Sequence, residues 1–155
     1  MKCIAPFLVL ALVLVSCARD KDEGWKDFAG RFYQAQHDYC STNMFVAESG
    51  MLALRTWTSD TNHVTEPAMS RDQALFKIDG RLFLLEDYLG NRVSADKFAT
   101  ESMEAYNRTR EYIISRHLNQ HPIEPMTTEE QLRDLLTRQD KGLDVGWMRK
   151  QEVTK

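Results

Sequence analysis

The sequence is poor in cysteine and proline, and it has no apolar run long enough to cross a membrane. Only three of its 155 residues are cysteine and four are proline. Three cysteines cannot build the dense disulfide framework that holds many small secreted domains together. A membrane-spanning helix needs about 20 consecutive apolar residues, and no stretch of the chain supplies them. Strand-like alternation of apolar and polar residues is also missing at any useful length, which excludes a β-rich fold.

A concentration of positive charge is missing as well. Lys and Arg number 20 against 23 Asp and Glu, so the formal net charge is −3, and both signs are scattered through every segment. A surface that binds nucleic acid usually carries a concentrated basic stripe. We therefore expect no nucleic-acid partner.

The first 16 residues have the three parts of a secretory leader. A basic start at Lys2 is followed by an apolar core from Cys3 to Val13 and by a region of small residues that ends at Ser16. Leaders of this build are removed from the mature protein. We predict that residues 1–16 are a cleaved signal peptide.

The leader closes on Leu14-Val15-Ser16-Cys17, which resembles the lipobox of bacterial lipoproteins. In that family the cysteine carries a diacyl thioether and becomes the new N-terminus, so the resemblance implies lipidation of Cys17. Each buried CH₂ of an acyl chain contributes about 0.8 kcal/mol, and two chains hold a protein firmly on a membrane. An alternative stays open, because Ser16-Cys17-Ala18 also fits the small-x-small rule of the ordinary signal peptidase, which would release a soluble protein beginning at Arg19.

Lipidation would place the protein in the bacterial cell envelope, attached to a membrane through Cys17. Ala18 stands where Asp would retain an enterobacterial lipoprotein at the inner membrane, so the pattern resembles that of outer-membrane lipoproteins. Residues 17–23 form a short charged tether that reaches about 20 Å when fully extended. Cys3 leaves with the leader and Cys17 would carry the lipid, so we expect no internal disulfide at Cys40 in the lipidated form.

From Trp25 onward the apolar residues recur every three or four positions, which is the period of an amphipathic helix. The spacing predicts helices over about 25–57, 72–89, 95–119 and 127–142, with a bend or break in the first one near 41–43. Amphipathic helices of this length bury their apolar sides only by packing against each other. We therefore predict an all-α, small four-helix bundle-like domain over residues 24–146, followed by a polar tail over residues 147–155.

Each predicted helix has a side that we expect to face the core. In the first helix this side is predicted at Trp25, Phe28, Phe32, Ala35, Tyr39, Thr42, Val46, Ser49 and Ala53. The second helix has the most regular stripe, Leu75, Ile78, Leu82, Leu85 and Leu89, and should lie at the centre of the core. Gly80 in that helix either marks the close approach of another helix or is an ordinary tolerated glycine.

Helix ends are predicted from capping residues. The second helix should begin after Ser70 as its N-cap and end at Gly90. The third should have Ser94 as its N-cap, with Val93 and Phe98 as a hydrophobic staple. The fourth should begin with a capping box formed by Thr127 and Glu130.

Two pairs of residues have the spacing of metal ligands, namely His117 with His121 and His37 with Cys40. The simpler interpretations are that histidines favour the negative end of a helix dipole and that Cys40 is a small buried hydrophobe. Neither pair has an evident third ligand, so we expect no metal and no cofactor.

Catalytic carboxylates are the remaining candidates for chemistry. Glu86, Asp87, Glu101 and Glu104 lie on predicted helices that also carry Lys and Arg, and we interpret them as part of solvated helix faces. No stretch after Cys17 resembles a catalytic motif. We therefore predict no catalytic residue and a protein that is not an enzyme.

Trp25, Phe28 and Phe32 are the candidate partner-binding residues, because they are the aromatic residues nearest the predicted anchor. They could line a groove for a partner or rest at the level of the lipid headgroups. The alternative is core packing, since all three fall on one side of the first predicted helix.

The expected function is that of a lipid-anchored envelope protein whose helical bundle binds a protein partner close to the membrane. In size, anchor and helix content such a protein is similar to the pilotins that escort secretion-pore subunits, to surface-exclusion lipoproteins and to lipid-anchored immunity proteins. The alternative is an enzyme or a small-ligand carrier that uses a pocket between helices. Convergent polar groups with a titratable residue of shifted pKa would favour the alternative, whereas an open apolar groove would favour the binding protein.

Overall fold

The structure is a computed structural model that describes residues 26–63, 65, 70–118, 121–143 and 145. These ranges contain helices and no strand. The helical segments are residues 26–39, α2 (Met44–Ser59), α3 (Arg71–Leu89), α4 (Arg92–Ser115) and α5 (Glu129–Gln139). The predicted all-α class is confirmed, with five helical segments where we predicted four. None of the helices in the described part of the chain is both long enough and apolar enough for a membrane crossing.

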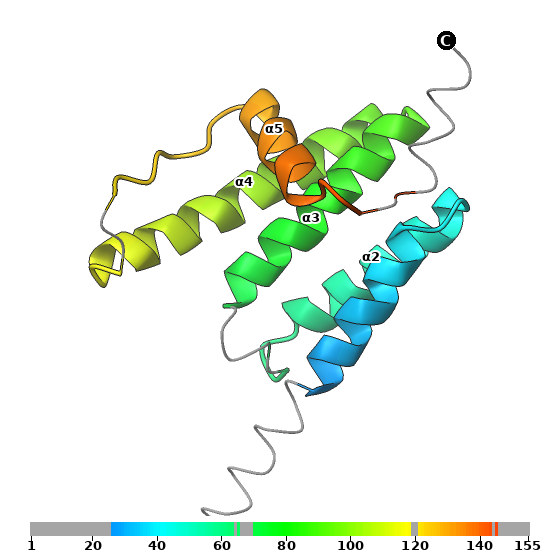
Figure 1. Cartoon of the computed structure of the whole chain (residues 1–155), viewed down its shortest axis with the longest axis horizontal. Helices are drawn as coiled ribbons and strands as arrows, with labels where there is room; N and C mark the ends of the chain where they lie inside the picture. The colour runs from blue at the N-terminus through cyan, green and yellow to red at the C-terminus, as the bar shows by residue number, and fades with distance from the viewer. Residues whose placement is uncertain (1–25, 64, 66–69, 119–120, 144, 146–155) are drawn as a thin grey trace, which may run out of the picture.

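The helices form two antiparallel pairs, and α5 lies across the second pair (Figure 1). The helix over residues 26–39 pairs with α2, and α3 pairs with α4. Because α3 contacts α2, α4 and α5, it is surrounded by other helices. The predicted stripe on α3 is confirmed at Ile78, Leu82 and Leu85, which are buried, while Leu75 and Leu89 are partly buried.

The predicted break in the first helix is confirmed at residues 40–42, which form a turn. Asn43 then caps α2, and its side-chain oxygen accepts a hydrogen bond of 3.1 Å from the backbone N–H of Phe45. The predicted core side beyond this break is wrong, because Val46, Ser49 and Ala53 are exposed. The side that faces the core is Met44, Ala47, Met51, Leu54 and Thr58. The turn rotates α2 relative to the preceding helix. Continuing the apolar spacing of that helix through the turn therefore predicts the wrong side of α2 as the core side.

The predicted boundaries of the second helix are confirmed. Ser70 and Gln73 form a reciprocal capping box at the start of α3. At its end, Gly90 adopts a left-handed φ of 79°, and its N–H donates to the carbonyl oxygen of Asp87 at 3.1 Å. Glycine adopts this conformation without steric cost, which is why the helix ends here.

Both ends of the third predicted helix and both ends of the fourth need correction. α4 begins at Arg92 after Asn91, so Ser94 is not its N-cap, and Val93 is 86% exposed and forms no staple. The helix ends at Ser115, four residues earlier than predicted. The capping box of α5 pairs Thr128 with Gln131, one position after the predicted pair. α5 ends at Gln139, three residues before the predicted end at 142. The shift at the start of α5 arises because the neighbouring Thr127 and Thr128 can both fill the capping role. Asn91 precedes α4 without a side-chain cap hydrogen bond.

Candidate binding groove

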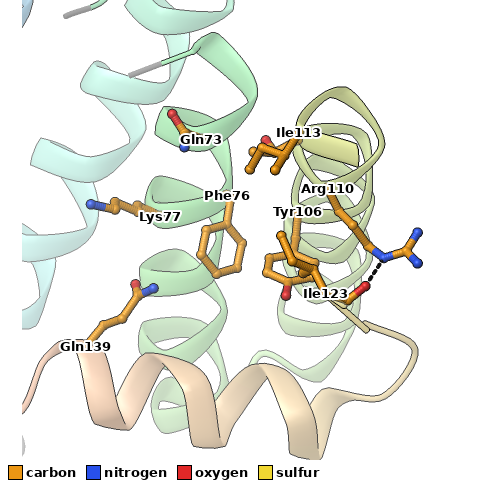
Figure 2. A pocket seen from close by; sticks show the side chains of 9 residues that line it. Gln73, Phe76, Lys77, Tyr106, Arg110, Ile113, Ile123 and Gln139 are labelled. Atoms are coloured by element: carbon orange, nitrogen blue, oxygen red, sulfur yellow. Dashed lines mark hydrogen bonds between the residues drawn. The ribbon is translucent and has the colours of Figure 1, made fainter. Parts of the chain in front are cut away.

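A groove of about 380 Å³ lies between α3, α4 and the connection that joins α4 to α5 (Figure 2). Its apolar floor is formed by Phe76, Tyr106, Ile113 and Ile123, and its polar rim by Gln73, Lys77, Thr109, Arg110 and Gln139. We call this feature the α3–α4 groove. Concave sites with an apolar lining and a few polar groups are the usual places where proteins bind ligands or partner segments.

The connection between α4 and α5 is held against α4 by side chains of that helix. Asn107 donates to the carbonyl oxygen of Met126 at 2.8 Å and accepts from the N–H of Met126 at 2.9 Å. Arg110 donates through Nε to the carbonyl oxygen of Ile123. The connection lies outside regular secondary structure, so its backbone groups need such partners. These hydrogen bonds fix the connection as one wall of the groove.

The floor of the groove is held at the contact between α3 and α4. The rings of Phe76 and Tyr106 lie 5.4 Å apart between centroids and are inclined at 57°. Tilted arrangements of this kind are favourable for aromatic pairs. Ser102 of α4 donates to the carbonyl oxygen of Phe76 at 2.9 Å, which ties the two helices together beneath the floor. Tyr106 also lines a second, shallower hollow of about 200 Å³ with Met126 and Leu135.

The two cations at the rim point apart. In Figure 2 the ammonium group of Lys77 and the guanidinium group of Arg110 extend toward opposite sides of the groove. Their charges therefore lie beside the apolar floor and not over it. This arrangement suits an apolar group seated on the floor with acidic groups on either side better than a single anion buried in the centre.

The predicted partner-binding residues lie elsewhere. Phe28 is 1% exposed and packs against Phe32 and Trp57, with ring centroids 5.8 and 6.0 Å away. Phe32 is partly buried against the same core. The burial of these two side chains matches the core-packing alternative, because the first helix turns this side toward α2. Trp25 and the predicted lipidation site Cys17 lie outside the described residues.

The candidate metal ligands are not part of a larger cluster of ligands among the described residues. His37 is exposed, and Cys40 is half-buried in the turn before α2. His117 lies two residues after the end of α4 with a left-handed φ of 52°, and its N–H donates to the carbonyl oxygen of Ile114 at 3.0 Å. Within the described residues, no group of three or more His, Cys, Asp or Glu side chains is arranged to hold a metal ion. That no metal binds remains a prediction.

The candidate carboxylates separate into buried and exposed groups. Glu86 is 4% exposed and accepts a hydrogen bond of 2.8 Å from Asn91, so its assignment to a solvated face is wrong. The contact of α2 with α3 covers this part of α3. Burial, with the nearby carboxyl of Glu86, raises the pKa of Glu48 on α2. Asp87 pairs with Arg92 and Arg133 at 2.9 Å on the surface, as predicted for a solvated face.

Arg55 of α2 joins two carboxylates from different helices. It contacts Asp79 of α3 at 2.5 Å and Glu101 of α4 at 2.7 Å. Burial raises the pKa of Asp79 to about 6, although the adjacent Arg55 opposes the shift. A second buried pair, Arg81 with Asp140 at 2.9 Å, fixes the end of α5 to α3. These ion pairs link helices, and none of their residues lines the α3–α4 groove.

Burial and the nearby carboxylate of Asp140 raise the pKa of Tyr39 well above its usual range. The guanidinium of Arg81 lies over the Tyr39 ring, 5.1 Å from the centroid. Tyr39 therefore belongs to the polar part of the core, where the first helix meets α3.

Comparison of the chain with family models, with curated proteins and with solved structures gives no match. Function is therefore inferred from the groove and from the sequence. Sequence reasoning missed Asn107 and Arg110, which position a groove wall. The available signal was the pair Pro122 and Pro125, because a proline-bounded connection is not helical and needs hydrogen-bond donors from a neighbouring helix.

Proposed function

We propose that this protein is a lipid-anchored component of the bacterial envelope that binds a segment of a protein partner in the α3–α4 groove. The observation that carries the proposal is an open groove with an apolar floor, an ordered wall and a charged rim. Grooves of this kind bind an amphipathic helix or an extended segment through a few apolar side chains. The outward-pointing Lys77 and Arg110 favour a segment that carries acidic residues beside its apolar anchor.

The position of the groove supports action close to a membrane. Phe28 near the start of the first helix stacks on Trp57 near the end of α2. Arg71, the first residue of α3, donates to the carbonyl oxygen of Thr58 at 2.9 Å. The start of α3, and with it Gln73 of the groove, therefore lies at the same end of the molecule as the start of the first helix. The nine-residue stretch from Cys17 to residue 26 reaches at most about 30 Å.

The alternative of an enzyme is less well supported. Enzyme sites bring polar groups together around a reacting atom, and their titratable residues often have shifted pKa values. Asp79 and Glu48 have raised pKa values, but Asp79 faces Arg55 and Glu48 lies on α2, so both are outside the groove. The charged groups of the groove point apart. This geometry favours binding over catalysis.

The anchor is tested by replacing Cys17 with Ala in the full chain. We expect the wild-type protein to carry acyl mass and to fractionate with membranes, and the variant to lack this mass. A wild-type protein without acyl mass that remains soluble would contradict the lipid anchor. Partner binding in the groove is tested by a separate experiment.

The groove is tested with two neighbouring substitutions on α4. Ile113→Glu places a charge on the apolar floor, while Ile114→Glu makes the same change at an adjacent exposed residue that does not line the groove. Proteins recovered with the full, detergent-solubilised chain are quantified by mass spectrometry. We expect Ile113→Glu to reduce recovery of a specific partner at least tenfold and Ile114→Glu to leave it within twofold. Equal recovery with both variants, each checked for helical content, would place the binding surface elsewhere.

A further inference from the structure

α2 has two apolar faces, and among the described residues only one of them is covered by other helices. The outer face of α2, together with Thr42 of the preceding turn, consists of seven exposed residues: Thr42, Phe45, Val46, Ser49, Leu52, Ala53 and Thr56. We call this set the α2 outer face. None of the seven is charged. Phe45 is the most exposed large apolar side chain of α2, with 75% of its surface accessible.

Single exposed apolar residues are common, but a continuous uncharged face is not. Other exposed helix faces of this protein carry ion pairs, such as Arg92 with Asp96 on α4 at 2.8 Å. The α2 outer face follows the spacing of three and four residues over four turns, which is the spacing of a helix-packing surface. A contiguous apolar patch of this kind marks an interaction site.

The order of residues on this face is self-complementary. When a second α2 is turned end for end about Ser49, residues equally far before and after Ser49 meet. Phe45 then lies opposite Ala53, and Val46 opposite Leu52. At the ends Thr42 faces Thr56, and at the centre the small Ser49 faces its own copy. Large side chains meet small ones, and apolar side chains meet apolar ones, as a twofold interface requires.

The surface is already shaped for this arrangement. An open hollow of about 430 Å³ runs along α2 and is lined by Phe45, Glu48, Ser49, Leu52, Ala53 and Thr56. Glu48, the charged residue in this lining, is half-buried at the edge of the α2 outer face. The phenyl ring of Phe45 from a second copy would fill the space over Ala53. In a parallel pair each Phe45 would instead meet the other Phe45, and the hollow over Ala53 would remain empty. The antiparallel arrangement therefore gives the better packing.

We propose that the α2 outer face binds the same face of a second copy of this chain, antiparallel, about a twofold axis at Ser49. This proposal is independent of the α3–α4 groove, which lies between other helices. The 16 residues of α2 span only about 24 Å, so the contact is smaller than the roughly 800 Å² per partner of a standard complex. The dimer is consequently weak and forms as concentration rises.

Cross-linking of single-cysteine additions tests both the contact and its direction in the full chain. A short thiol-reactive linker should join two copies through Ser49→Cys at least ten times more efficiently than through Thr100→Cys, an exposed control on α4. The unsubstituted chain reports any background from its native cysteines. When differently tagged Thr42→Cys and Thr56→Cys chains are mixed, the antiparallel pair should give mainly the mixed product.

Two results would overturn the proposal. The first is Ser49→Cys cross-linking no better than the Thr100→Cys control at concentrations up to several hundred micromolar. The second is predominance of the 42–42 and 56–56 products, which a parallel pair would give.

Sedimentation provides a separate measurement, in which Phe45→Glu should abolish the concentration-dependent rise in mass while Val93→Glu, at another highly exposed apolar site, on α4, should not. Circular dichroism confirms that both variants are folded, and an unsubstituted chain that stays monomeric would also refute the dimer.

Discussion

Gly80 of α3 lies directly against Leu136 of α5. A Cβ atom placed on Gly80 would be 2.7 Å from Cδ2 and 3.0 Å from Cδ1 of Leu136, whose side chain is 2% exposed. Real Cβ atoms do not approach other heavy atoms this closely, so the buried Leu136 side chain or one of the two helices would have to shift. The glycine in the middle of the central helix therefore marks the place where α5 crosses it.

We predict that Gly80→Ala lowers the free energy of unfolding by about 1 kcal/mol. Overpacking costs about 1–3 kcal/mol, and the better helix propensity of alanine offsets about 1 kcal/mol of this. In a Leu136→Ala background the steric conflict is gone, and the same change should raise the free energy of unfolding by about 0.5–1 kcal/mol. Urea denaturation of the four proteins measures both effects. If Gly80→Ala instead raises the free energy of unfolding in the wild-type background, α5 accommodates the added methyl group without a loss of stability.

Gly90 and His117, two of the left-handed residues that follow helix ends, should respond to substitution in opposite directions. Gly90 has φ 79° and nothing near the position of a Cβ, so Gly90→Ala should cost about 1 kcal/mol through backbone strain alone. His117 has φ 52° with a side chain present, so His117→Gly should stabilise by roughly 0.5–1 kcal/mol. Thermal and urea unfolding of both variants give the comparison. Destabilisation by His117→Gly would indicate that the imidazole makes a contact worth more than the relieved strain.

Local sequence signals determined the helices well. Apolar spacing located every long helical segment, and Ser70 and Gly90 marked the ends of the central one. The side of α2 that faces the core could not be predicted in this way. Periodicity describes positions within one helix, whereas the turn at residues 40–42 sets how the next helix is rotated. Val46 and Ser49 were assigned to the core for this reason, although they lie on the opposite face.

The groove could not be predicted from apolar spacing, for a related reason. One wall depends on Asn107 binding the backbone of Met126, 19 residues further along the chain, through a connection without a repeating pattern. Aromatic residues near the predicted anchor suggested Phe28 and Phe32 instead. Their spacing indicated an apolar side correctly, but spacing alone does not distinguish a side buried by another helix from one that a partner would cover.

Leu82 is the position at which the core assignment is tested most directly. Its side chain is 0% exposed at the centre of α3, so Leu82→Ala should leave a cavity and lower the free energy of unfolding by about 2–5 kcal/mol. Val93→Ala is the matched control on an exposed aliphatic residue and should change stability by no more than about 0.5 kcal/mol. Chemical denaturation measures both. A Leu82→Ala domain within about 1 kcal/mol of the wild type would contradict the burial of this stripe.

The buried carboxyl of Asp79 faces charged groups from two other helices. Arg55 of α2 contacts it directly, and Glu101 and Lys97 of α4 act on it from further away. Burial is the largest influence and raises its pKa to about 6 from the usual value of 3.8, while Arg55 and Lys97 oppose this and Glu101 adds to it. The folded protein therefore holds the proton more tightly than the unfolded chain between these two pH values.

This difference in proton binding sets the direction of the pH dependence. The contribution of Asp79 to stability is fully present below about pH 4, and it is lost as pH rises through about 6. A shift of about two pH units corresponds to at most about 3 kcal/mol. We expect the free energy of unfolding of the wild type to fall across this window relative to that of Asp79→Asn, which has no proton to release there. Urea denaturation of both proteins at half-unit steps from pH 4 to 7.5 measures the difference. If the wild type instead gains stability over Asp79→Asn as pH rises, the ion pair with Arg55 outweighs burial, and the carboxyl is charged throughout the range.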